Sequence, residues 1–155
     1  MVTAIPCEHE ELKKCALTSL DLSTLLGTYK GAYQQKVLDT SLIELRLSKL
    51  DDSKQLKMEL LKDGKLMKSL VLKQNSVLAG QLDVIGDDKL CVLVLDSGDK
   101  HLTLLHPLFG EDLWTIFLKK DKNLLPQDLT MAKNHLKCTK LLSDKLDMET
   151  LKLRN

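Results

Sequence analysis

Apolar and charged residues alternate along several short segments of this chain, and this period of two restricts the fold more than any other feature. Residues 43–47 read IELRL and residues 56–60 read LKMEL. Residues 82–84 continue the pattern, and residues 68–72 follow it less cleanly. Successive side chains of a β-strand point to opposite faces of the sheet. The pattern therefore predicts strands that are buried on one side and exposed to water on the other.

Turn-forming residues separate these segments at short intervals. Clusters that contain Asp, Ser, Asn or Gly lie at residues 51–53, 63–64, 73–76, 86–88 and 97–99. The pair Asp63-Gly64 favours a two-residue hairpin turn, because such turns need residues that accept a positive φ. Strands that end in turns every 8–12 residues or so are typical of an all-β barrel or sandwich.

Further segments complete the expected sheet. Residues 28–34 form the first expected strand, in which Gly31 permits a bend at a barrel corner, and residues 102–105 and 113–118 form the last two. Residues 90–95 are apolar on both faces, so we expect a later helix to cover their outer side. About eight strands joined in order predict an all-β fold, an eight-stranded antiparallel up-and-down β-barrel with room for one small ligand.

The period becomes helical after residue 123. Pro126 suits the first turn of a helix, where its missing N–H costs little. Four residues fall on one face of that helix at the required spacing: Leu129, Ala132, Leu136 and Thr139. We predict one C-terminal flanking α-helix over residues 126–142 and a short final strand at 148–153. With the barrel at residues 27–120, these elements form a single domain over residues 1–155.

Composition excludes several classes of function. The formal net charge is +1, with acidic and basic residues mixed along the chain, so no strong field attracts nucleic acid. No apolar run reaches the length of about eighteen residues that a transmembrane helix needs. Aromatic residues make up only 3% of the chain, which argues against the aromatic cages of amine carriers. A cavity in this protein would be lined by branched aliphatic side chains.

Two stretches resemble members of the lipocalin family. Residues 22–29 read LSTLLGTY and resemble the lipocalin opening motif, with Tyr29 where the tryptophan usually stands. Residues 114–122, followed by Cys138, resemble the last barrel strand and the helix of plasma lipocalins of the alpha-1-acid glycoprotein type. Residues 5–7 resemble the start of those mature proteins, and apolipoprotein M shares the general arrangement. The resemblance implies a lipocalin barrel that binds an apolar ligand.

The resemblance also implies a role for the four cysteines. It implies a disulfide from Cys7 to Cys138, with Cys15 as the alternative partner, while four buried free thiols are the simplest other state. Cys91 lies in a strand, and one lipocalin branch uses a barrel thiolate as the nucleophile of a prostaglandin isomerase. Only Lys89 is near enough in the sequence to lower the pKa of the Cys91 thiol, so we expect Cys91 to be a packed side chain.

Three further assignments follow from the resemblance and from strand alternation. Trp114 is expected to face the ligand near the mouth of the barrel, with Ile116 inward beside it; the alternative is a core tryptophan under the helix. His106 could be a polar contact in the mouth, although a solvated loop histidine is the more common situation. Lys119 or Lys120 could replace the arginine that packs across the floor of standard lipocalins.

The apolar faces of the expected strands supply the other candidate ligand-binding residues. They are Ile43, Leu45, Leu47, Leu56, Met58, Leu60, Leu70, Leu72, Leu82, Val84, Leu93, Leu102 and Leu104.

These observations predict an extracellular carrier or sequestering protein for a lipid, steroid or drug-like molecule. We expect no catalytic residues, no metal, no cofactor and no nucleic-acid partner, and we expect a monomer. Residues 1–6 are too short for a secretory signal, so we expect a secreted protein whose signal has been removed. Two alternatives stay open: a thiol-dependent enzyme of the isomerase type, and a surface-active or interaction protein without a ligand pocket.

Overall fold

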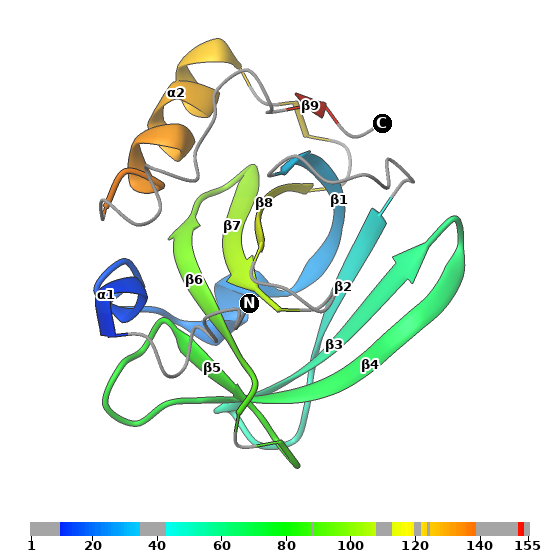
Figure 1. The fold of residues 1–155 in the computed structure, drawn as a ribbon. Helices are drawn as coiled ribbons and strands as arrows, with labels where there is room; N and C mark the ends of the chain where they lie inside the picture. The colour runs from blue at the N-terminus through cyan, green and yellow to red at the C-terminus, as the bar shows by residue number, and fades with distance from the viewer. Residues whose placement is uncertain are drawn as a thin grey trace, which may run out of the picture.

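The barrel closes on itself. The computed structural model describes residues 10–34, 43–87, 89–107, 113–119, 122–123, 125–138 and 152–153. Each strand of the barrel pairs with the next in antiparallel fashion, and the last and second strands both pair with the first (Figure 1). The strands are β1 (Gly27–Gln34), β2 (Ile43–Lys49), β3 (Gln55–Lys62), β4 (Lys65–Gln74), β5 (Gln81–Val84), β6 (Cys91–Ser97), β7 (His101–His106) and β8 (Leu113–Lys119). The predicted eight-stranded up-and-down barrel is confirmed.

Two local features of the sheet agree with the sequence. The β3–β4 hairpin turns through Asp63 and Gly64, whose φ angles are 52° and 79°. This is the positive-φ pair that a tight two-residue hairpin needs. The pairing of β1 with β8 shifts register between Gly31 and Tyr33, which is where the sequence predicted a bend.

One face of the strands builds an apolar interior, which we call the inner cluster. Its buried members are Leu22, Leu25, Tyr29, Ile43, Leu45, Leu47, Leu56, Met58, Leu60, Leu72, Leu82, Val84, Val92, Val94, Leu102, Leu104 and Phe117. Most of them come from alternate positions along β2 to β7, so the period of two in the sequence corresponds to one inward face.

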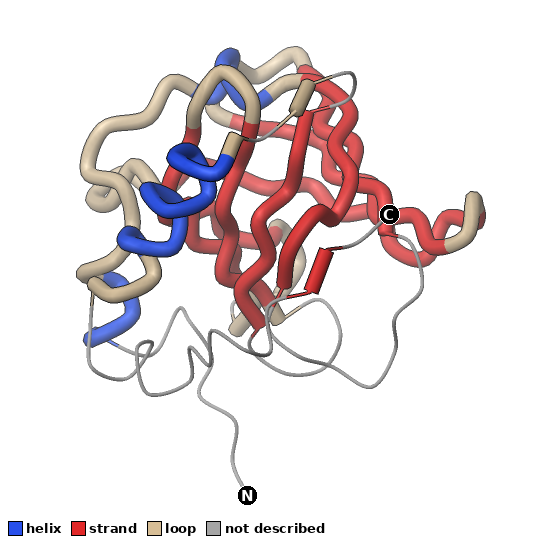
Figure 2. The backbone as a smooth tube through the Cα atoms, turned by 90° about the horizontal axis from the view of Figure 1, so that it is seen from above, coloured by secondary structure: helices blue, strands red, loops and turns tan. Residues whose placement is uncertain are grey.

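A second apolar cluster lies outside the barrel wall, beneath two helices, and we call it the outer cluster. Helix α1 (Glu10–Lys13) contributes Leu12, and α2 (Pro126–His135) with the turn after it contributes Ala132 and Leu136. Its other buried members are Cys15, Ala16, Cys91, Leu93, Leu95, Leu105, Trp114 and Ile116. Figure 2 shows the helices outside the strands. Residues 91–95 of β6 are therefore buried on both faces, as their apolar sequence predicted.

Helix α2 is shorter than the sequence predicted. It begins at Pro126 and its first turn is held by Asp128, whose carboxylate accepts a hydrogen bond of 3.1 Å from the Leu125 amide. It ends at His135 rather than at residue 142, and the chain continues through a turn to Cys138. Residues 139–151 lie outside the described residues, and a last strand, β9 (Lys152–Leu153), pairs with β1.

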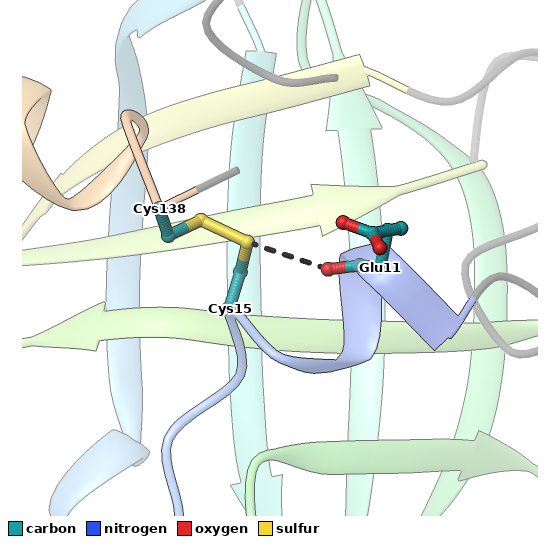
Figure 3. Close-up of a disulfide and its surroundings, with 3 residues drawn as sticks. All are labelled: Glu11, Cys15 and Cys138. Carbon is teal, nitrogen blue, oxygen red and sulfur yellow. Dashed lines mark hydrogen bonds between the residues drawn. A yellow bond between two sulfur atoms is a disulfide. The ribbon is translucent and has the colours of Figure 1, made fainter. Parts of the chain in front are cut away.

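A disulfide joins the turn after α1 to the turn after α2. It links Cys15 to Cys138 with a Cα–Cα distance of 5.5 Å (Figure 3). The predicted pairing of Cys7 with Cys138 is wrong, and the alternative partner is the one observed. The reason is spatial: Leu12 and Ala16 pack in the outer cluster with Leu136, so the segment around Cys15 lies beside the end of α2. Cys91 is also disulfide-bonded.

The segment before β1 closes one end of the barrel. The short 3-10 helix η2 (Leu22–Leu25) packs Leu22 and Leu25 into the inner cluster, and the Tyr29 hydroxyl donates a 2.7 Å hydrogen bond to the Leu25 carbonyl. Lys119 extends Nζ to 3.5 Å from the Thr24 carbonyl oxygen at this end of the barrel. We call this end the floor.

The Leu17 backbone runs close against the floor end of β5 and β6. The Leu17 amide donates to the Val94 carbonyl at 2.9 Å, and the Gly80 amide donates to the Leu17 carbonyl at 2.7 Å. A Cβ atom on Gly80 would lie 2.5 Å from the Leu17 nitrogen, so only glycine permits this approach. Within the described ranges, no helix has the length and apolar character needed to cross a bilayer.

Candidate ligand-binding site

The inner face of the barrel brings together most of the residues that the sequence proposed for ligand binding. Leu70 packs against the inner cluster, and eleven other predicted residues are buried in it. These eleven are Ile43, Leu45, Leu47, Leu56, Met58, Leu60, Leu72, Leu82, Val84, Leu102 and Leu104. Apolar and charged residues alternate within strands β2 to β5. For that reason the sequence indicated which face of these strands points inward.

Three predicted residues face the other way. Trp114, Ile116 and Leu93 belong to the outer cluster, so the prediction that they line the ligand site is wrong. The pairing register gives the reason. Leu104 and Leu102 face inward, and their partners across β8 are Thr115 and Phe117, which leaves Trp114 and Ile116 on the outer face. The stated alternative, a core tryptophan under the helix, is the arrangement observed.

Sequence reasoning missed four inner-cluster residues on the strands. Tyr29, Val92, Val94 and Phe117 all face inward and are at most 1% exposed. Val92 pairs with Leu82, which is inward, so the correct phase of β6 depends on its neighbour β5. A signal for Tyr29 was available, because the opening motif places an aromatic residue at that position.

A buried polar pair interrupts the apolar lining at the end opposite the floor. His106 Nε2 lies 2.9 Å from Thr115 Oγ1, and both side chains are almost fully buried. The His106 ring also stands 6.2 Å from the Phe117 ring, between centroids, and Phe117 belongs to the inner cluster. His106 is therefore a buried inward side chain, and the solvated loop histidine considered in the sequence is not what the structure contains.

Burial determines the charge state of this histidine. Removal from water, and then the positive charge of Lys68, lower the pKa of His106 from 6.5 to about 3. The imidazole is neutral at neutral pH, so the pair can donate or accept hydrogen bonds but carries no charge.

Strand β4 leaves the barrel wall open on one side. Only Leu72, Lys73 and Gln74 pair with β5, and the residues before Val71 have no described strand on that side. The β3–β4 hairpin projects from the barrel in both views (Figures 1 and 2). Leu70 is half-buried at this position, and its neighbours toward the hairpin turn are exposed. The edge of the inner face is therefore partly exposed to solvent at Leu70 of β4.

The other described side chains of the inner face have little contact with solvent. Val84 is 7% exposed, Ile43 5%, and most other members are at most 2% exposed.

Cys91 is the residue on which the isomerase alternative depends. Cys91 is fully buried in the outer cluster and is disulfide-bonded, so this state has no Cys91 thiolate for the isomerase alternative. No group of three or more metal-binding side chains occurs within the parts of the chain that the structure describes.

A polar hollow beside α2 is a separate feature. Its volume is about 310 Å³, and it contains Asp96 between two histidines, with His101 Nε2 at 2.6 Å and His135 Nε2 at 3.8 Å. Burial by itself would raise the pKa of Asp96, but the hydrogen bond from His101 and the charges of both histidines outweigh it and hold the pKa below its ordinary value. These contacts connect α2 to the β6–β7 hairpin, which is a structural role.

The comparisons with known proteins concern the fold. Neither the protein-family profiles nor the curated protein sequences contain a match to this chain. Among solved structures, apocrustacyanin C2 is similar with a TM-score of 0.61 and 17% identity, over 98% of this chain and 88% of its own. Lobster apocrustacyanin A1 is similar with a TM-score of 0.58 and 18% identity, over 90% of this chain and 86% of its own. Both are lipocalins with an eight-stranded barrel, so this chain has the lipocalin fold.

Proposed function

From the lipocalin fold, we propose that this protein binds one small hydrophobic molecule inside its barrel and serves as an extracellular carrier or sequestering protein. The observation that carries the proposal is the apolar inner face of the barrel, which is built mostly from aliphatic side chains and which η2 closes at the floor. The proposed contacts are the inner-cluster side chains, and no catalytic residue is proposed.

Area bookkeeping gives the expected affinity range. Burying about 200 Å² of apolar ligand surface contributes about 5 kcal/mol before the costs of association. Because the inner side chains already contact one another, part of this gain replaces contacts that the ligand-free protein makes. We therefore expect micromolar binding for the best ligands, with an association rate limited by side-chain rearrangement.

The disulfides support the extracellular part of the proposal. Disulfides persist mainly in oxidising compartments, and both Cys15 and Cys138 as well as Cys91 are bonded. The resemblance to plasma lipocalins of the alpha-1-acid glycoprotein and apolipoprotein M type agrees with secretion. We propose a monomer, since the barrel completes its own sheet.

A titration with an uncharged fluorescent apolar probe tests the proposal. The expected result is saturable one-to-one binding that a fatty acid or a steroid displaces. Native mass spectrometry of the protein from its natural fluid would weigh any ligand that co-purifies. Adsorption of the probe without saturation and without displacement would contradict a binding site in the barrel.

One observation favours a second function, that of a surface-active or interaction protein. Leu66 and Met67, next to the turn of the β3–β4 hairpin, are each 55% exposed. Replacing both with serine should abolish surface adsorption if this function holds, and it should leave saturable probe binding unchanged if the carrier function holds.

A further inference from the structure

Positive charge is concentrated on the β3–β4 hairpin. Between Gln55 and Gln74 the chain has five lysines against the acidic residues Glu59 and Asp63, a net charge of +3, whereas the whole chain carries +1. Glu59 is half-buried, and Asp63 in the turn is the exposed acidic side chain of the hairpin. The small net charge of the chain therefore includes a local excess of positive charge on one projecting element.

The exposed lysines of this hairpin lack acidic partners. Near α2, Lys100 forms an ion pair of 3.3 Å with Asp128. In contrast, no ion pair between described residues involves the exposed hairpin lysines Lys57, Lys65, Lys68 and Lys73. Their ammonium groups face water, so an external anionic partner can reach them.

Two apolar side chains lie among these lysines at the tip of the hairpin. Leu66 and Met67 are each 55% exposed and stand between Lys65 and Lys68 in the sequence. The hairpin projects from the barrel in both views (Figures 1 and 2), so its tip can reach a surface before the rest of the molecule does. Adjacent exposed apolar residues on a projecting element indicate a contact site.

Protection of a strand edge explains only part of this arrangement. The residues of β4 before Val71 have no described strand on the β5 side, and lysines on such an edge oppose pairing with another strand. The same lysines disfavour a second copy of this chain, because two hairpins would bring like charges together. Leu66 and Met67 promote contact rather than prevent it, so edge protection does not account for them.

A bilayer that contains anionic lipids is the partner that uses both features. Its headgroups attract lysines, and its interfacial layer accepts exposed apolar side chains, whereas a polyanionic polysaccharide would use the charge alone. We propose that the tip of the β3–β4 hairpin docks the protein onto an anionic lipid bilayer, with Leu66 and Met67 in the interfacial layer and Lys65 and Lys68 against the headgroups. This inference rests on the second function proposed above and names its surface, and it does not depend on what the barrel binds.

Cosedimentation with lipid vesicles tests the docking. Vesicles of phosphatidylcholine alone are compared with vesicles of an equal mixture of phosphatidylcholine and phosphatidylserine. At low ionic strength the protein should bind the mixed vesicles about 20-fold tighter, because each lysine near an anionic surface contributes about fivefold. Raising the salt concentration should release the protein, because salt screens exposed charges.

Two charge-matched variants locate the contact. Lys65→Gln combined with Lys68→Gln should weaken binding to the mixed vesicles about 20-fold. Lys122→Gln combined with Lys137→Gln removes the same charge from exposed positions before and after α2, and it should leave vesicle binding unchanged.

An apolar variant separates a bilayer from other polyanions. Leu66→Ser combined with Met67→Ser keeps every charge and should weaken vesicle binding about tenfold, because less apolar surface is buried. Retention on heparin should not change. Circular dichroism checks that each variant folds.

The outcomes separate this proposal from the functions proposed above. Equal binding to neutral and mixed vesicles would overturn the anionic bilayer and leave a general surface activity. Vesicle binding that survives the serine variant would assign the hairpin to polyanions and overturn the bilayer, and a dimer without vesicles that the serine variant dissociates would assign it to a second copy. The titration with an apolar probe tests the carrier function independently, since none of these variants alters the inner cluster.

Discussion

The inner and outer clusters share strands β6, β7 and β8, yet they are held together in different ways. The inner cluster is enclosed by the sheet and by η2, and its Tyr29 hydroxyl has a carbonyl partner. The outer cluster depends on two short helices and the Cys15–Cys138 disulfide. Two buried polar atoms on the outer face of β7 and β8, Thr103 Oγ1 and Trp114 Nε1, have no hydrogen-bond partner among the residues that the structure describes.

This difference teaches that burial alone does not make two apolar regions equivalent. A closed sheet satisfies its own backbone groups and needs little else to exclude water from its interior. Helix α2 has only ten residues, and a helix of that length is marginal without tertiary support. We therefore expect the outer cluster to depend on its covalent link, and the inner cluster to depend on packing.

Removing the disulfide should have the largest effect. Replacing both Cys15 and Cys138 with serine should lower the free energy of unfolding by about 4 kcal/mol, because the link closes a loop with a sequence separation of 123. Urea unfolding of the double variant measures this loss. Probe binding inside the barrel should persist in 0 M urea, and a loss below about 1 kcal/mol would show that the outer cluster stands without the link.

Two neighbouring leucines on β7 compare the clusters directly. Leu104 faces the inner cluster and Leu105 the outer cluster, and both are at most 2% exposed. Each substitution by alanine should cost about 3 kcal/mol of stability. Only Leu104→Ala should change the affinity for an apolar probe, measured by fluorescence titration, because only it enlarges the interior. An equal change in affinity for both variants would contradict the proposal that only the inner cluster contacts the ligand.

Acid should weaken the inner cluster first. The pKa of His106 is about 3 in the folded protein and 6.5 in the unfolded chain, so below pH 6.5 the unfolded state binds more protons than the folded state. Stability should therefore fall as the pH drops from 6.5 toward 3, by about 2 kcal/mol between pH 7.5 and pH 5. Urea unfolding at both pH values measures the change.

A His106→Gln variant is the control for that measurement. Glutamine does not titrate and can still bond to Thr115, so the loss between pH 7.5 and pH 5 should shrink. An unchanged loss would assign the effect to other groups. Asp96 in the outer region acts at lower pH, because its pKa is lowered and its contribution to stability disappears only when the carboxylate is protonated in stronger acid.

The smallest effects should come from removing one polar atom in each cluster. Tyr29→Phe leaves the Leu25 carbonyl without its partner and should cost about 1 kcal/mol. Trp114→Phe removes an indole N–H that has no partner, so the loss of ring volume should be partly offset by the relief of an unsatisfied donor. Thermal unfolding compares the two variants. A larger loss of stability for Tyr29→Phe than for the bulkier change at Trp114 would support the contrast.

The sequence predicted most of the fold because strands and turns follow from local patterns of residues. Alternation located the strands, and Asp63-Gly64 located a hairpin turn that needs positive φ. The inward phase was correct where one face was charged, as at Leu45 and Met58. Alternation says which residues share a face, and charged neighbours say which of the two faces meets water.

The sequence did not predict correctly which residues face inward where both faces of a strand are apolar. Leu93 and Trp114 have uncharged residues on both sides along their strands. Only the pairing of Val92 with Leu82 and of Thr115 with Leu104 settles their direction. The cysteine pairing failed for a related reason, since it depends on where the turn after α1 comes to rest. Long-range contacts of this kind leave no periodic signal in a single sequence.

The close approach of Leu17 to Gly80 has a consequence for the order in which the protein assembles. Leu17 is synthesised early, but its two backbone partners, Gly80 and Val94, emerge from the ribosome much later. The floor can form only after β5 and β6 exist, and until then the leucines of η2 have no apolar surface to cover. A newly made chain should therefore expose the leucines of η2 until β5 and β6 have been synthesised. A chaperone that recognises short leucine-rich stretches would bind there.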